Sequence, residues 1–212
     1  MLNKISIFEI MKLFLIILLV FPFELLSQNF QRLTNNEYGF SIDKPRKWVM
    51  WEMQEIKNNF TKFDFTAKQK GEILTNTNQS VLIFSFGRSN RIKKGETMVP
   101  LVQIYLRSNP ETTFDGFEGA FTRSINEDVR PLFKEFEYLE QPSRIELDGK
   151  QAVSMLTKSK LLHNGTEVIS RSRIIAVPKG SYFFQISFID GDGDYDCQEL
   201  FLKIIDSIDI ED

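Results

Sequence analysis

The residues best suited to chemistry are four aspartates in a short glycine-containing loop: Asp190, Asp192, Asp194 and Asp196. Alternating carboxylates in such a loop can surround a hard cation with oxygen ligands, as Ca²⁺ requires. The loop is not an EF-hand, because Tyr195 stands where that motif needs glycine and Phe201 where it needs a bidentate glutamate. The interpretation we favour is a connection from a strand to a helix that Asp192 or Asp194 caps. A Ca²⁺ site formed by the four aspartates is the alternative that we carry forward as a prediction to test.

Other catalytic chemistry has few candidate residues. His163 is the only histidine and Cys197 the only cysteine, which excludes a His/Cys zinc site and an intrachain disulfide. His163 precedes an Asn-Gly turn, a position typical of an exposed loop residue, and we expect Cys197 to be a small buried hydrophobe. No nucleophile elbow, phosphate-binding loop or dinucleotide fingerprint is present. The many carboxylates leave a hydrolase open, but no spacing selects a catalytic pair.

Two groups of basic residues indicate surfaces rather than catalysis. A cluster that follows a predicted strand consists of Arg88, Arg91, Lys93 and Lys94. It is able to meet an anionic surface, and a solvated loop is the simpler interpretation. Arg171 and Arg173 alternate along another predicted strand, where pairing with Asp or Glu of a neighbouring strand explains them.

The segment 11–27 predicts export. Lys12 precedes an apolar run from Leu13 to Phe23, and Ser27 offers a small residue for cleavage, which is the pattern of a secretory signal peptide. At about 1.5 Å per residue the run spans roughly 16 Å, about half of a ~30 Å hydrocarbon core. We therefore favour a cleaved signal over the alternative, an uncleaved membrane anchor.

Removal of residues 1–27 makes the mature protein periplasmic or extracellular, with no stable membrane span. Translation from Met11 rather than Met1 is a further hypothesis. Residue 28 is glutamine, so no thiol follows the apolar run to accept a lipid, which argues against a lipoprotein.

Length and charge bound the mature chain. Residues 28–212 have the length of one domain, which buries enough surface to fold without a disulfide or a metal. The formal net charge is −3, and so mildly acidic a chain gives no electrostatic reason to expect nucleic acid as a partner. The 20 phenylalanines favour a sheet-centred core.

Apolar alternation predicts strands in the first half of the domain. We expect residues 28–36 to form a loose polar arm, followed by a strand at 38–43 in which Tyr38, Phe40 and Ile42 share one face. Extended segments are also expected at 48–52, 60–65, 80–87 and 99–106, with a loop at 69–80.

A helix is expected next, because apolar residues recur at helical spacing: Phe114, Phe117, Phe121 and Ile125. Thr112 or Thr113 can cap this helix, and Pro131 ends or kinks it. A second helical stripe runs from Phe201 to Ile208 and predicts a closing helix.

Three turn signals divide the region between the two helices: Asp148-Gly149, Asn164-Gly165 and Pro178-Lys179-Gly180. They predict a four-stranded antiparallel meander at 139–147, 150–161, 166–177 and 181–189, whose last strand is nearly all apolar and therefore central. The resulting class is α+β: an α-β-α sandwich with a central, mainly antiparallel sheet and flanking helices.

The order of these elements resembles a known family. Residues 38–48, Tyr-Gly-Phe-Ser-Ile-Asp-Lys-Pro-Arg-Lys-Trp, resemble the entry of PsbP-like domains. Residues 148–152 resemble the turn into that fold's meander, and residues 201–208 resemble its closing helix. The family also includes Mog-like relatives and bacterial secreted proteins. The resemblance implies a single domain at 37–212 that serves as a binding or assembly module, generally without catalysis.

Three functional hypotheses follow. The first is an exported, non-enzymatic PsbP-like module, without a cofactor, that binds a protein partner at the cell envelope. The second is a secreted protein that binds a small ligand or Ca²⁺. The third is an envelope hydrolase that uses carboxylates.

Overall fold

The computed structural model describes residues 29–60, 64–67, 69–71, 80–89, 98–163, 165–191 and 196–212. Residues 1–28, with the predicted signal peptide, lie outside this set. The elements are β1 (Phe30–Asn35), β2 (Phe40–Pro45), β3 (Val49–Met50), α2 (Met53–Phe60), β4 (Val81–Gly87), β5 (Leu101–Ser108), α4 (Phe114–Ser124), η1 (Ile125–Val129), η2 (Arg130–Leu132), β6 (Glu135–Leu147), β7 (Lys150–His163), β8 (Thr166–Lys179), β9 (Tyr182–Gly191), α5 (Gln198–Ile205) and β10 (Asp209–Ile210).

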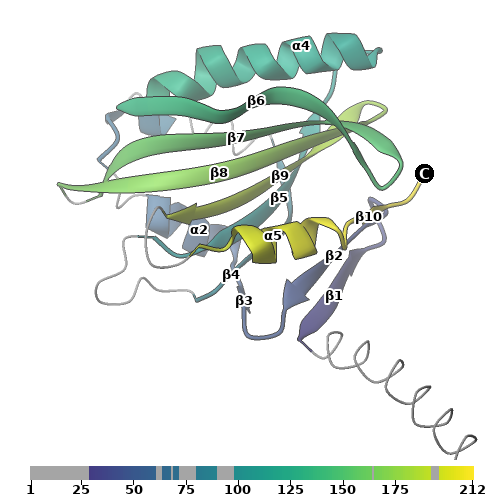
Figure 1. The fold of residues 1–212 in the computed structure, drawn as a ribbon, viewed down its shortest axis with the longest axis horizontal. Coiled ribbons are helices and arrows are strands. Elements are labelled where there is room, and N and C mark those ends of the chain that lie inside the picture. Colours follow the sequence, from purple (N-terminus) through teal and green to yellow (C-terminus); the bar gives the residue numbers. More distant parts are fainter. Residues whose placement is uncertain are drawn as a thin grey trace, which may run out of the picture.

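The largest element is a sheet whose strands lie in the order β3-β4-β5-β9-β8-β7-β6, and every neighbouring pair is antiparallel (Figure 1). Strands β6 to β9 form the predicted meander. Two of its turns contain Gly149 and Gly180 with φ of +70° and +61°, a conformation that glycine adopts without strain. β9 lies between β5 and β8, which confirms its predicted central place.

One face of this sheet carries the main core. Phe184 and Phe188 of β9 point to this face and pack with Phe201 and Ile204 of α5, the predicted closing helix. The same core includes the small sheet β1-β2-β10, whose Phe40 ring lies 4.9 Å from the ring of Phe184 between centroids. α5 and this small sheet therefore share one layer below the large sheet (Figure 1).

α4 covers the opposite face and confirms the predicted helix (Figure 1). The Thr113 side chain caps its first turn. Phe117 and Phe121 pack on Phe183 of β9, with ring centroids 5.2 and 5.8 Å apart. Because successive side chains of a strand point to opposite faces, Phe183 and Phe184 attach the two layers to the same central strand.

The arrangement confirms the α+β class with antiparallel sheets. The layer opposite α4 combines a helix with the three-stranded sheet, so the predicted α-β-α sandwich describes that layer incompletely. β10 was not predicted; two residues are too short for a sequence pattern to mark.

The N-terminal arm is a correction to the prediction. Residues 30–35 do not form a loose arm: they form β1, which pairs along its whole length with β2. Phe30 and Leu33 pack against the main core, and this burial outweighs the polar composition of the segment.

The segment after β2 also differs from the prediction. Of the extended segment expected at 48–52, only Val49–Met50 form a strand, β3; Trp48 and Trp51 on either side are buried, whereas Met50 is 45% exposed. α2 then occupies residues 53–60, because the Glu55 carboxylate accepts a hydrogen bond from the Glu52 N–H at 2.9 Å and starts the helix. The strand predicted at 60–65 is therefore wrong at residue 60, and residues 64 and 65 are not in a strand either.

Other parts of these predictions fall on undescribed residues. Positions 61–63 of the predicted strand and 72–79 of the predicted loop lie outside the described residues. The loop prediction is wrong at residues 69–71, which are helical: the Lys70 N–H donates to the Thr66 carbonyl at 2.9 Å. None of the helices within the described ranges has the length and apolar character needed to span a bilayer.

Phe184→Ala tests the role of the central strand. Phe184 is fully buried, and we expect its truncation to lower the free energy of unfolding by about 3–5 kcal/mol, because it leaves a cavity in the main core. Leu202→Ala is the control: Leu202 lies on α5 and is 53% exposed, so we expect a change within about 0.5 kcal/mol. Urea unfolding measures both, and equal losses would contradict the packing described here.

Candidate functional site

The predicted aspartate loop begins with a buried ion pair. Asp190, near the end of β9, is 0% exposed, and both of its carboxylate oxygens accept hydrogen bonds from Arg171 of β8, at 3.1 and 2.9 Å. The backbone N–H of Cys197 donates to the same carboxylate at 3.2 Å. A bidentate pair of this kind satisfies a carboxylate that would otherwise be costly to bury.

Asp196 completes this cluster from the start of α5. Its Oδ1 accepts hydrogen bonds from Arg171 at 3.3 Å and from the Gln198 N–H at 3.0 Å. Burial acts to lower the pKa of Arg171, but the hydrogen bonds and charges of Asp190 and Asp196 raise it above the ordinary value. The cluster therefore ties α5 to β8 and β9.

The Ca²⁺ prediction is answered only in part by this geometry. Asp190 and Asp196 lie close to one guanidinium, while Asp192 and Asp194 lie outside the described residues. Within the described part of the chain, no group of three or more His, Cys, Asp or Glu side chains is placed to hold a metal. The four-aspartate site stays a prediction, as does capping of α5 by Asp192 or Asp194.

The remaining predicted residues are dispersed. Arg173 pairs with Glu140 through two hydrogen bonds of 2.8 and 2.7 Å, and the bond from Arg173 lowers the pKa of Glu140. Arg171 pairs with Asp190 of the neighbouring strand β9, as predicted, whereas the partner of Arg173 lies on β6, with β7 between the two strands. Burial raises the pKa of the Cys197 thiol, which favours its unreactive protonated form.

Two further predicted positions lie at strand ends. Arg88 follows β4, whereas the other members of its basic cluster, Arg91, Lys93 and Lys94, lie outside the described residues. Arg88 lies near enough to the Asp190 cluster for its charge to act on the pKa of the Cys197 thiol, in the direction opposite to burial. His163 is the last residue of β7 and is half-buried, so the expectation of an exposed loop residue is wrong: pairing with Thr166 of β8 extends the hairpin to this position.

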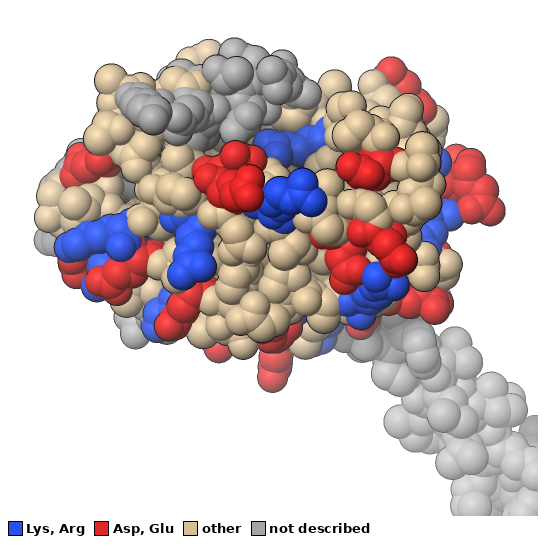
Figure 2. All heavy atoms as spheres, turned by 90° about the horizontal axis from the view of Figure 1, so that it is seen from above, with Lys and Arg blue, Asp and Glu red and all other residues tan. Residues whose placement is uncertain are grey.

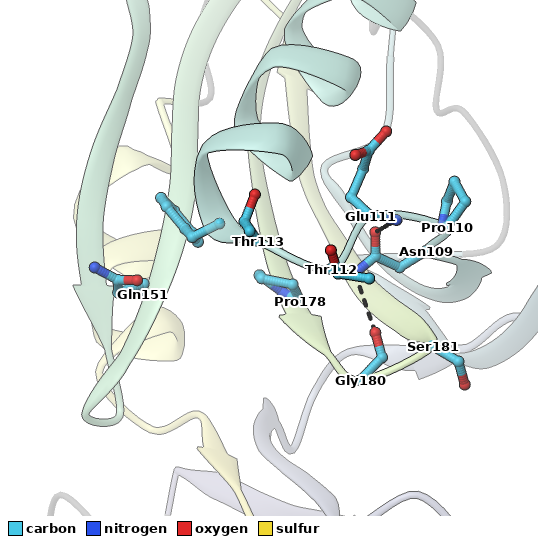
Figure 3. Close-up of a pocket in the computed structure, with 10 residues that line it drawn as sticks. Asn109, Pro110, Glu111, Thr112, Thr113, Gln151, Pro178, Gly180 and Ser181 are labelled. Atoms are coloured by element: carbon cyan, nitrogen blue, oxygen red, sulfur yellow. Dashed lines mark hydrogen bonds between the residues drawn. The ribbon is translucent and has the colours of Figure 1, made fainter.

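A hollow of about 670 Å³ lies beside the N-terminal end of α4 (Figure 3). Asn109 connects two segments that line the hollow. The Asn109 Nδ2 donates to the Gly180 carbonyl at 3.1 Å, and the Asn109 Oδ1 accepts from the Glu111 N–H at 3.1 Å. Of the described residues that line this hollow, only Glu111 is titratable. One carboxylate in a polar hollow selects no particular chemistry.

A second cavity, of about 430 Å³, lies between α4 and the large sheet, and we call it the α4 cleft. Its floor comes from three strands: Arg107 of β5, Ile174 of β8, and Phe183 and Gln185 of β9. Its roof comes from α4 and the turns that follow, including Phe117, Ala120, Phe121, Ile125 and Val129. The cleft is therefore apolar on most sides, with a cation in its floor.

Arg107 is the unusual residue of the α4 cleft. It joins no other described residue by a hydrogen bond or an ion pair. Burial lowers the pKa of Arg107, and its interaction with Tyr105 acts in the opposite direction. Burial raises the pKa of Tyr105, because for a tyrosine the charged form is the deprotonated one. An arginine stays protonated at any physiological pH, so a positive charge is held in the floor of the cleft.

The roof of the α4 cleft includes a π-helical turn, η1, in which the Arg130 N–H donates to the Ile125 carbonyl. Asn126 anchors this turn: its Nδ2 donates to the Thr122 carbonyl at 3.0 Å, and its Oδ1 accepts from the Tyr138 hydroxyl of β6 at 3.1 Å. Pro131 then stands in η2, which confirms that the regular helix ends before it. Such turns are rare and frequently mark functional sites.

Sequence reasoning missed Arg107, although a signal for it was present. Val102, Ile104 and Leu106 of β5 face the main core, so alternation places Gln103, Tyr105 and Arg107 together on the α4 side. Three polar residues in a row on the inner side of a central strand indicate a site rather than a packed core.

The face that carries α4 shows Lys and Arg interspersed with Asp and Glu, rather than a field of one sign (Figure 2). Arg144 of β6 illustrates this: it pairs with Asp115 of α4 at 2.7 Å and also contacts Glu118. Mixed charge of this kind does not form the basic surface that a polyanion requires.

Comparison with known proteins gives a fold. No protein-family model matches the sequence, and no curated protein matches it. The structure is similar to the solution structure of cyanobacterial PsbP (CyanoP) from Synechocystis, with a TM-score of 0.50 and 10% identity over 86% of this chain and 93% of that one. The fold is therefore PsbP-like, as the sequence predicts. The predicted resemblance to Mog-like relatives stays a prediction.

Two further structures resemble the chain more weakly. One is a protein of unknown function from Pseudomonas aeruginosa, with a TM-score of 0.42 and 7% identity over 84% of this chain and 95% of that one. The other is LpqN from Mycobacterium tuberculosis, involved in cell envelope biogenesis, with a TM-score of 0.44 and 9% identity over 84% and 87%. These TM-scores are too low for a conclusion about this chain.

Arg171→Met tests the buried cluster. Asp190 would keep a buried charge without its bidentate partner, so we expect the free energy of unfolding to fall by about 3–5 kcal/mol. Arg173→Met is the matched control on the same strand. Its partner Glu140 is 52% exposed, so a loss of about 0–1 kcal/mol is expected. Urea unfolding of both variants measures these losses. A loss for Arg171→Met no larger than the control's would contradict the stabilising role of the Arg171–Asp190 pair.

Proposed function

We propose that the protein is an exported, non-enzymatic binding module of PsbP-like fold, with its sheet layered between helices, that acts on a protein partner at the cell envelope. The PsbP-like fold carries the proposal, since the sequence resemblance to that family implies binding or assembly rather than catalysis. The apolar segment that ends at Ser27 supports export.

The described surface supports a protein as the partner. The face that carries α4 has both positive and negative side chains (Figure 2). Such a mixture is typical of the polar rim of a protein interface, whereas a nucleic-acid site needs a continuous basic surface. The exposed apolar side chains Val49, Met50, Val81, Leu139 and Leu202 are spread over several elements, so none of them by itself locates the interface.

Ligand binding is a second candidate, and a specific observation favours it. The α4 cleft has the volume of a small-molecule site, an apolar lining and a cation that no other described residue pairs. The Ca²⁺ hypothesis for the Asp190–Asp196 loop belongs to the same class of function.

Native mass spectrometry of the protein purified from its own envelope fraction tests the first candidate. We expect a mature mass that begins at Gln28, with a second polypeptide bound in a defined ratio. The control is a variant that lacks residues 1–27, which should stay inside the cell and carry no such polypeptide. A mass that retains residues 1–27, or exported protein without a second polypeptide, would contradict the proposal.

Thermal unfolding with millimolar Ca²⁺ tests the aspartate loop. If the loop binds Ca²⁺, the folded state is stabilised and the Tm rises by about 2–8 °C. The double variant Asp192→Asn, Asp194→Asn should lose this rise, and Mg²⁺ should not reproduce it, because Mg²⁺ demands stricter geometry. An unchanged Tm with Ca²⁺ would rule out the site.

A further inference from the structure

The α4 cleft places a cation that has no ion-pair partner among the described residues beside apolar walls. Arg107 projects from the same side of the large sheet as Phe183, its neighbour across the β5–β9 pair. Phe117 and Phe121 of α4 face Phe183 from above, at 5.2 and 5.8 Å between ring centroids. A molecule in this cleft therefore meets a guanidinium at one side and aromatic rings at another.

The guanidinium of Arg107 has hydrogen-bonding capacity to spare. Arginine carries five N–H donors in a planar fork that matches a carboxylate or phosphate. Arg171 and Arg173 use that fork in bidentate pairs within this same fold. Arg107 makes no such pair within the described residues, although a half-buried charge gains most from one.

Acidic side chains near Arg107 limit the charge that the cleft accepts. Glu111 and Asp128 also line the cleft, but neither forms an ion pair with Arg107. Asp128 is exposed, and its carboxylate accepts a hydrogen bond from the Ser124 hydroxyl at 2.8 Å. Two carboxylates at the same cavity repel a polyanion more strongly than a monoanion, so the single guanidinium of Arg107 is matched by one negative charge at most.

The apolar walls define the rest of the ligand. Beyond the phenylalanines, Ile125 and Val129 continue the lining along η1, and Leu132 extends it into η2. The volume of about 430 Å³ lies within the roughly 300–1,000 Å³ of small-molecule sites. An apolar group gains by leaving water for such a wall, whereas a small polar ion does not.

We propose that the α4 cleft binds a single-chain amphiphile with one carboxylate, with the carboxylate on the guanidinium of Arg107 and the apolar chain between α4 and β9. This inference rests on the second candidate function and gives its ligand chemistry. It is independent of a protein partner, because its test uses the purified protein alone.

Isothermal titration calorimetry with three probes tests the proposal on the unmodified protein. Decanoate carries both the carboxylate and the chain, decyltrimethylammonium keeps the chain with the opposite charge, and acetate keeps the carboxylate alone. We expect decanoate to bind at least about tenfold more tightly than either of the others, because only decanoate satisfies both halves of the site. Equal binding of the two decyl compounds, or of acetate and decanoate, would overturn the proposal.

Variants locate the site. Arg107→Met removes the charge but keeps an unbranched side chain, and we expect it to weaken decanoate binding about tenfold or more. Arg123→Met is the matched control, because Arg123 is an exposed arginine of α4 that does not line the cleft. Ala120→Phe fills the cleft from its roof and should also abolish binding. Unchanged affinity in either cleft variant would refute the assignment.

If no probe binds at all while Ca²⁺ still raises the Tm, the amphiphile proposal fails, whereas the more general proposal that the protein binds a ligand survives.

Discussion

The structure depends on β9 being buried on both faces. This strand joins β5, from the first half of the chain, to the meander β6–β9, and both layers of the molecule attach to it. Phe183 and Phe184 are adjacent in sequence, yet one packs under α4 and the other against β2 and the α5 layer. A strand in this position must be apolar almost throughout, which is why its sequence marks it as central.

The two faces of the large sheet are covered by different layers. Below the large sheet, α5 and the small sheet fill the layer, and the Arg171–Asp190–Asp196 cluster fixes the start of α5 to β8 and β9. Above the sheet, α4 and the turns η1 and η2 form the roof of a cavity whose floor holds Arg107. One face is therefore built for stability, and the other leaves room beside a charge. That asymmetry is the physical basis for the ligand site that we propose at α4.

Features that depend on neighbours in sequence were predictable, and features that depend on distant contacts were not. The turn glycines marked the meander, and Thr113 with its helical phenylalanine stripe marked α4, because turn and cap chemistry is local. β1 was missed because its polar sequence gains order only by pairing with β2. Arg107 was missed for a related reason. Alternation along β5 already placed it on the α4 side of the sheet, but the cavity that it lines exists only because α4 lies above it.

A crystal structure of the protein grown with decanoate tests most directly the proposal that the α4 cleft binds a carboxylate amphiphile. The account predicts a carboxylate within hydrogen-bonding distance of the Arg107 guanidinium, with the chain between Phe121 and Phe183. Decanoate bound elsewhere on the surface, with the α4 cleft filled only by water, would contradict it.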